Sequence, residues 1–333
     1  MNKIIINSLY PRSEELIKKT RDFDRNRINE NELEEYFNID FLEFLNLQNQ
    51  LNFYYYYNGM FKFKDLLRPF TLILKNSYAN TLIRFEETNT FWRKLEISHF
   101  DIFYDNFEII FNKYLNLDYL IKNISFSNSK KILITLPSIF TFYKYSNLNF
   151  EQINLLLTEF IKNLLSYLNS NNFNYKENLS IILVEYLDFS YNKDLELFEE
   201  NFRYLNNLIN QLNKENLELF YFTYSNLKNI MLKLFSLDFK GISINFYKNN
   251  IEDIDFNKLN KLLLAGVIYT ESSLLETEDK IHSFINKINK YFDLNNIIFT
   301  IDFIPYLLPR NIMDNKIKNL ANILNKQKLT TKN

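Results

Sequence analysis

Short runs of about five to seven mostly apolar residues recur along the chain. They are nearly continuous rather than alternating, which is typical of strands buried on both faces of a parallel sheet. Eight such runs are present, at residues 3–6, 51–57, 131–136, 180–185, 218–223, 241–245, 262–268 and 297–301.

Longer stretches with helical periodicity separate these strands. They cover residues 13–47, 150–168, 194–213, 227–235, 274–291 and 310–324. Eight strands that alternate with helices predict an α/β fold of the (β/α)8 TIM-barrel type. The alternative is a doubly wound open sheet, but the chain has no glycine-rich phosphate loop to support it.

The segment between the second and third predicted strands, residues 62–128, is too long for one crossover. We therefore expect an inserted excursion after the second strand, with extra helices and a hairpin around residues 95–111. The whole chain is expected to form one TIM-barrel domain over residues 1–328, followed by a frayed tail at 329–333.

The composition excludes several classes of site. Phe, Tyr, Asn, Lys and Ile are abundant, whereas Gly is only 3 and Cys 0. This bias matches drift in an A+T-rich genome. The absence of cysteine rules out disulfides and cysteine-bound metals. Because 39 Lys+Arg are balanced by 40 Asp+Glu, no basic surface for nucleic acid is predicted. No apolar run reaches the roughly 18 residues of a membrane helix, so we expect a cytoplasmic protein without a membrane span.

Chemistry in a TIM barrel sits where strands end and the following loops begin. The predicted strand ends carry Tyr57, Asn58, Pro137, Glu185, Thr223, Asn245, Tyr269 and Asp302.

Several segments near these strand ends resemble the cobalamin-independent methionine synthase family, especially its archaeal and single-barrel members. They occur in the family's order from residue 10 to residue 310. The matching segments are residues 10–16 (Tyr-Pro-Arg-Ser-Glu-Glu-Leu), 20–25, 30–35, 58–59, 65–70, 87–94, 136–142, 223–226, 264–267 and 308–310.

The family activity is 5-methyltetrahydropteroyltriglutamate–homocysteine S-methyltransferase, in which zinc turns the thiol of homocysteine into a reactive thiolate. The resemblance implies that the family's His-x-Cys pair falls on Tyr221 and Thr223, its Glu on Asn245 and its last Cys on Phe303. None of these is a normal zinc ligand. Since the only histidines, His99 and His282, do not follow strand ends, we expect no metal.

The resemblance also suggests substrate-binding residues. Glu185 is expected to accept an ammonium group, and the arginines to bind a carboxylate through a bidentate fork. Two alternatives remain open. The Glu185 carboxylate can instead pair with a structural cation, and the arginines can instead tie loops together. Two further family positions are changed, with Leu9 in place of a Ser and Asn58 in place of an Asp. The full candidate set is Glu185, Arg68, Thr88, Asn89, Arg93, Tyr224, Asn226 and Arg310.

Residues 222–224 (Phe-Thr-Tyr) resemble the zinc-free amino-terminal barrel of the family's double-length members. One hypothesis is therefore a barrel that binds folate or an amino acid and is the non-zinc half of a two-chain enzyme, with a zinc-bearing barrel as partner. A second is an active methyltransferase with a changed methyl donor or acceptor. A third is a degenerate, non-catalytic remnant. Beyond 5-methyltetrahydrofolate as a ligand, no cofactor is expected.

Overall fold

Eight parallel strands form a barrel in the computed structural model, which describes residues 3–85, 90–124 and 130–330. The strands pair in the order β1-β10-β9-β8-β7-β6-β5-β2. Every predicted strand is present, so the predicted TIM barrel is confirmed. The strands are β1 (Ile4–Ile5), β2 (Tyr55–Tyr57), β5 (Lys131–Pro137), β6 (Leu179–Glu185), β7 (Glu218–Thr223), β8 (Gly241–Asn245), β9 (Leu262–Ile268) and β10 (Ile297–Ile301).

The strand ladder is interrupted between β1 and β2, which are the two ends of the pairing order. Just beyond their carboxyl ends, the Tyr10 amide donates to the Gly59 carbonyl at 3.0 Å. The Tyr57 hydroxyl also donates to the Ser8 carbonyl. These bonds bring the two edges together and complete the ring.

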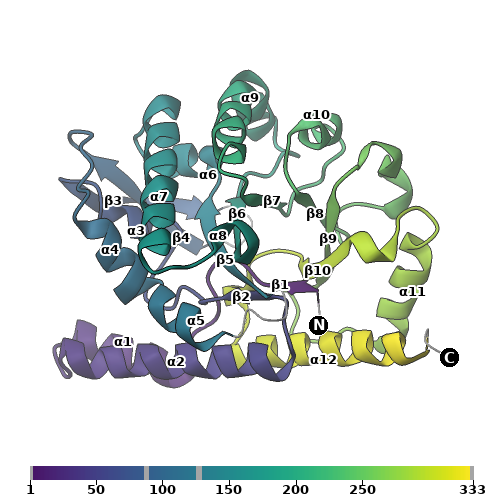
Figure 1. The fold of residues 1–333 in the computed structure, drawn as a ribbon, viewed down its shortest axis with the longest axis horizontal. Coiled ribbons are helices and arrows are strands. Elements are labelled where there is room, and N and C mark those ends of the chain that lie inside the picture. Colours follow the sequence, from purple (N-terminus) through teal and green to yellow (C-terminus); the bar gives the residue numbers. More distant parts are fainter. Residues whose placement is uncertain (1–2, 86–89, 125–129, 331–333) are drawn as a thin grey trace.

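Helices cover the outside of the barrel (Figure 1). The long helices α1, α2 and α12 lie along one side, at the bottom of the view, and α7, α9, α10 and α11 cover other sides. The helices are α1 (Glu14–Asp24), α2 (Glu30–Gln50), α3 (Arg68–Thr71), α4 (Asn106–Ile109), α5 (Leu117–Asn123), α6 (Ile139–Lys144), α7 (Phe150–Ser170), α8 (Tyr175–Asn178), α9 (Asn192–Asn213), α10 (Met231–Ser236), α11 (Glu278–Ile288) and α12 (Arg310–Thr330).

Two helix boundaries differ from the prediction because of asparagines. The segment 13–47 divides into α1 and α2, since Asn26 adopts a φ of 55° and Asn29 caps the amide of Glu32 at the start of α2. Asparagine tolerates the left-handed region and is a favoured N-cap. At the other end α2 continues to Gln50 and Asn52 turns the chain with a φ of 50°, which shortens the second strand to Tyr55–Tyr57.

The excursion after β2 contains a hairpin, but not at residues 95–111 as predicted. It is formed by β3 (Ser77–Phe85) and β4 (Thr90–Ile97), and the predicted region holds α4 and a π-helical turn, Ile110–Tyr114. At the carboxyl end, α12 extends to Thr330, so the helix continues into the expected tail. Within the described residues no helix combines the length and apolarity needed to cross a bilayer.

One face of the strands can be identified as the barrel interior from contacts across it. The rings of Tyr55 on β2 and Phe220 on β7 meet at 5.6 Å although β5 and β6 lie between their strands. Side chains alternate along a strand, so Glu218, Phe220 and Phe222 share this inner face. At the amino ends of the strands, this inner face holds an ion pair between Lys131 and Glu218 at 3.1 Å.

Gly266 on β9 lies where backbone atoms leave no room for a side chain. A β-carbon there would meet the carbonyl oxygens of Ile244 and Ile301 at 3.1 Å and the α-carbon of Asp302 at 3.2 Å. Backbone atoms of neighbouring strands cannot move away as a flexible side chain can.

We predict that Gly266→Ala lowers the free energy of unfolding by about 1–3 kcal/mol, as overpacking typically does. Urea denaturation followed by circular dichroism measures the change. Asn26→Gly is the control: Asn26 already has a φ of 55°, so glycine fits there and the loss should stay within about 0.5 kcal/mol. Equal losses in both variants would show that the tight packing around Gly266 is not what limits substitution.

Candidate functional site

The barrel mouth, meaning the carboxyl ends of the eight strands and the loops that follow them, contains most of the predicted site residues. Glu185 ends β6 and is fully buried. It accepts hydrogen bonds from Thr141 Oγ1 at 2.7 Å, from the Tyr221 hydroxyl at 3.1 Å and from the Leu187 amide at 2.9 Å. Ser138 Oγ donates as well. We call Glu185, Ser138, Thr141 and Tyr221 the Glu185 cluster.

The Glu185 cluster lies on the outer face of the barrel. Glu185 pairs in register with Thr223, and Val184 with the inward-facing Phe222. Alternation therefore turns Glu185 toward α6, whose N-cap is Ser138. Its partners among the described residues are three hydroxyls and an amide, so the structural cation of the alternative interpretation is not among them.

Burial raises the pKa of Glu185 to about 7, and the hydrogen bonds from Ser138, Thr141, Leu187 and Tyr221 limit the rise. A carboxyl group in the unfolded chain titrates near 4.5. Between these two values the folded state holds a proton that the unfolded state has released, so this group makes the protein less stable as the pH rises.

The positions onto which the resemblance maps the family's zinc ligands lie on different faces of the barrel. Tyr221 and Thr223 share the outer face with Glu185, whereas Asn245 pairs with Gly266 in register and lies on the inner face. On the inner face, the residues at the same spacing are Phe222 on β7 and Tyr224, which directly follows β7. Tyr224 contacts Phe303 with a ring-centroid distance of 4.1 Å, and its carbonyl accepts a hydrogen bond from Asn245 Nδ2 at 3.2 Å.

Neither the outer pair, Tyr221 and Thr223, nor the inner pair, Phe222 and Tyr224, fits a zinc ion. Neither pair supplies an imidazole or a thiolate. The chain has no cysteine. His99 is exposed and His282 lies on α11. In residues 3–85, 90–124 and 130–330, no group of three or more His, Asp or Glu side chains is placed to hold a metal.

The arginines expected to bind a substrate carboxylate have structural partners. Arg310 donates from Nε to Asp314 at 2.9 Å and lies 3.7 Å from Asp40. Its guanidinium also lies 4.9 Å from the ring centre of Tyr10 and 5.3 Å from that of Phe61. It thus joins α12 to α2 and to the segment after β1.

Arg68 bonds Asp65 at 2.9 Å and the Arg93 carbonyl at 2.8 Å, which ties the loop after β2 to the hairpin. The Arg93 side chain is exposed. Asn226 donates to the Lys248 carbonyl at 2.8 Å and accepts from the Lys228 amide at 2.9 Å, so it holds a loop. Thr88 and Asn89 lie outside the described residues.

The centre of the mouth is aromatic and contains charged groups that the sequence analysis did not select. Lys248 lies 4.6 Å from the Tyr224 ring centre and pairs with Asp188 at 3.0 Å. Asp302 directly follows β10 and accepts from the Thr270 amide at 2.8 Å. Burial raises its pKa to about 6. Its place directly after a predicted strand was the signal that could have identified it.

Several buried polar atoms of the mouth have no hydrogen-bond partner among the described residues, among them Arg68 Nη1, Glu276 Oε2 and Asn7 Nδ2. Asn7 follows β1 and is fully buried. Its Oδ1 accepts from Ser8 Oγ at 2.8 Å, but its Nδ2 finds no acceptor among the described residues. An unsatisfied buried donor costs about 1–3 kcal/mol, which favours a water or ligand acceptor at this position.

No protein-family model matches the chain, and no curated protein matches it in sequence. Solved structures do. A B12-independent methionine synthase from Shewanella sp. W3-18-1, in complex with selenomethionine, superposes with a TM-score of 0.66 at 12% identity, covering 91% of this chain and 92% of that one. The fold is shared with these enzymes.

A second structure agrees over nearly the full length of both chains. It is a protein from Listeria monocytogenes whose assignment as a vitamin-B12-independent methionine synthase is provisional. Its TM-score is 0.64 at 14% identity, with 96% of each chain covered. At these identities the likeness establishes the barrel and its excursion, and leaves the chemistry to be argued from the residues.

We predict that the Glu185 cluster makes the protein less stable as the pH rises from about 4.5 to 7. In Glu185→Gln, this drop should shrink by up to about 3 kcal/mol because the variant has no proton to lose. Urea denaturation at pH 5 and pH 8 measures both proteins. Asp302→Asn is the control. Because the pKa of Asp302 is about 6, this variant should remove only the loss of unfolding free energy that is complete by about pH 6. An unchanged pH dependence in Glu185→Gln would contradict the prediction.

We also predict that Arg310→Ala lowers the unfolding free energy of the ligand-free protein by about 3–5 kcal/mol, because it leaves Asp40 and Asp314 without their cation. Arg203→Ala is the matched control. Arg203 is exposed and also lies over a ring, that of Tyr204 at 4.9 Å, so its loss should cost less than about 1 kcal/mol. If Arg310 served only a ligand carboxylate, Arg310→Ala would leave the ligand-free stability unchanged.

Proposed function

We propose that this chain is a zinc-free member of the cobalamin-independent methionine synthase family. In this proposal it binds folate or a small amino acid in the barrel mouth, and it performs no zinc-activated thiol chemistry of its own. It acts as the non-zinc partner of a separate zinc-bearing barrel.

Family membership is supported by motifs that occur in the family's order along the whole chain and by the superposition over more than nine-tenths of both chains. The backbone adds a further observation. In the family's opening Gly-Ser-Tyr/Phe-Pro motif, the glycine falls on Ser8, next to the Leu9 position. Ser8 has a φ of 63°, in the left-handed region that favours glycine. A non-glycine residue in this strained conformation supports the alignment.

The unpartnered Nδ2 of Asn7 is the observation that carries ligand binding. It lies beside Ser8, whose carbonyl accepts the Tyr57 hydroxyl, so it belongs to the top of the barrel interior. Trp92 of the hairpin packs near this region, edge-on to Tyr186 at 5.1 Å. An acceptor on a ligand, such as a carboxylate or a pterin carbonyl, would satisfy the Asn7 amide.

The proposal predicts that the purified chain binds 5-methyltetrahydrofolate, L-homocysteine or L-methionine in calorimetry, contains no stoichiometric zinc by elemental analysis, and transfers no methyl group alone. Asn7→Leu removes the unpaired donor at similar volume. It should weaken binding at least tenfold, about 1.4 kcal/mol. Because it also removes the acceptor of the Ser8 hydroxyl, urea denaturation of both proteins checks that the variant is folded under the binding conditions. Asn154→Leu is the matched control, since Asn154 on the outer helix α7 also has a buried amide atom without a partner, and it should leave binding unchanged.

Failure of the wild-type chain to bind any of these compounds would contradict the proposal and favour a non-catalytic remnant. Methyl transfer to homocysteine by the isolated chain would also contradict the proposal, because it would show that the chain performs the thiol chemistry alone. Stimulation of transfer by an added zinc-bearing barrel would support the partnership.

One observation favours the second hypothesis, an active methyltransferase with a changed donor or acceptor. Asp302 is a buried carboxyl at the mouth with a pKa of about 6, so it can exchange a proton near neutral pH without a metal. Turnover that depends on pH near 6 and is abolished in Asp302→Asn would support this alternative.

A further inference from the structure

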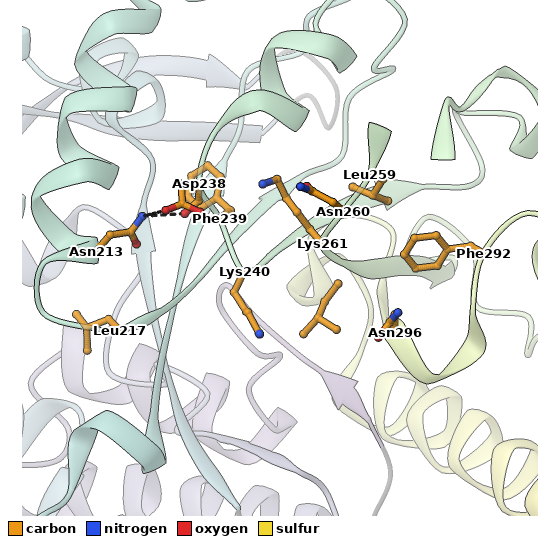
Figure 2. A pocket seen from close by; sticks show the side chains of 11 residues that line it. Asn213, Leu217, Asp238, Phe239, Lys240, Leu259, Asn260, Lys261, Phe292 and Asn296 are labelled. Atoms are coloured by element: carbon orange, nitrogen blue, oxygen red, sulfur yellow. Dashed lines mark hydrogen bonds between the residues drawn. The ribbon is translucent and has the colours of Figure 1, made fainter. Parts of the chain in front are cut away.

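Two lysines lie on neighbouring chain segments at the opposite end of the barrel from the mouth. Lys240 directly precedes β8 and Lys261 directly precedes β9, and the Leu262 amide donates to the Lys240 carbonyl at 2.9 Å. Both side chains line a hollow of about 570 Å³. Figure 2 shows that their amines point in opposite directions, with the Lys261 amine on the side of Asp238 and Asn260. The two amines therefore have different surroundings although their backbones are neighbours.

The Lys261 amine has neither an ion pair nor a hydrogen bond within the described part of the chain. Other lysines at this end of the barrel do have partners. Lys3, directly before β1, donates to the Asn295 carbonyl at 2.6 Å, and Lys131, the first residue of β5, pairs with Glu218 at 3.1 Å. The fold thus leaves Lys261 without a direct partner.

The surroundings of Lys261 disfavour its charged form. Asp238 and Lys240 are the other charged residues that line the hollow. The Asp238 side chain accepts a hydrogen bond from Asn213 Nδ2 at 2.8 Å and acts on Lys261 only through space. Lys240 is exposed and solvated, whereas Lys261 is only partly exposed, and an ammonium group that loses water without a direct counter-ion becomes less stable. Burial accordingly lowers the pKa of Lys261, and the Asp238 carboxylate opposes this change.

A lysine in this position is suited to act as a nucleophile. Only the neutral amine has a free lone pair, so a lysine that loses its proton more readily reacts faster near neutral pH. Lys261 also borders the hollow and remains partly exposed, so a small reagent can reach it. Access and a larger neutral fraction therefore coincide at this one side chain.

We propose that Lys261 is an acylation site, at which the ε-amine accepts an acyl group from a small acyl phosphate or thioester. The amine lone pair attacks the acyl carbon and a C–N bond forms, while the C–O bond to phosphate or the C–S bond to the thiolate breaks. Solvent takes up the proton that the amine loses. The product is an uncharged amide, so acylation removes an ammonium group that has no direct partner. The site is independent of the ligand proposed for the barrel mouth.

Lys240 is the matched control within the same molecule, because it borders the same hollow but is exposed. The full chain is incubated near pH 7.5 with acetyl phosphate or with acetyl-coenzyme A, and mass spectrometry of its peptides gives the acylation rate of each lysine. We expect Lys261 to react at least about threefold faster than Lys240 with one donor or both, since a lower pKa leaves more of the amine neutral. The faster donor identifies the preferred leaving group.

The ratio of the Lys261 rate to the Lys240 rate tests the cause. In Asp238→Asn, which keeps an acceptor for Asn213 but removes the carboxylate that favours the ammonium form, this ratio should rise about twofold. In the unaltered chain it should fall between about pH 8 and about pH 10.5, because both amines become neutral at high pH. A Lys261 rate that does not exceed the Lys240 rate with either donor, or an excess that persists undiminished at about pH 10.5, overturns the proposal.

Discussion

Alternation of side chains along a parallel strand determines which chemistry each part of this barrel can perform. A residue on β7 faces either the interior or the surrounding helices, and the next residue faces the other way. Phe220 meets Tyr55 across the barrel at 5.6 Å, so Phe222 and Tyr224 belong to the interior and Tyr221 and Thr223 do not. The assignment of every strand-end residue to the mouth or to the outer shell depends on this alternation.

The polar residues that most resemble site residues hold the fold together. Glu185, buried on the outer side, joins β6 to β7 through Tyr221 and to α6 through Ser138 and Thr141. Arg310 joins α12 to α2 through Asp40. Satisfying a buried charge or carboxyl requires several partners from different elements, so such groups naturally stand where elements meet. The proposed ligand position is the centre of the mouth, around Asn7, Tyr224 and Asp302.

The two ends of the barrel differ in character. At the carboxyl ends of the strands the polar groups are few, buried and surrounded by aromatic rings. At the amino ends, the charged residues Lys240 and Lys261 directly precede β8 and β9. The interior between the two ends is filled with side chains.

The amino-acid sequence alone determined the barrel: continuous apolar runs and helical periodicity depend on local burial, and all eight predicted strands are present. The tertiary structure decided three things. It placed the hairpin at β3 and β4 because pairing is a long-range contact that local pattern does not specify. It divided residues 221–224 between two faces, because their direction follows from the register of the neighbouring strands. It left Asn7 Nδ2 without a partner among the described residues, since only the closed ring decides which groups from separate strands meet.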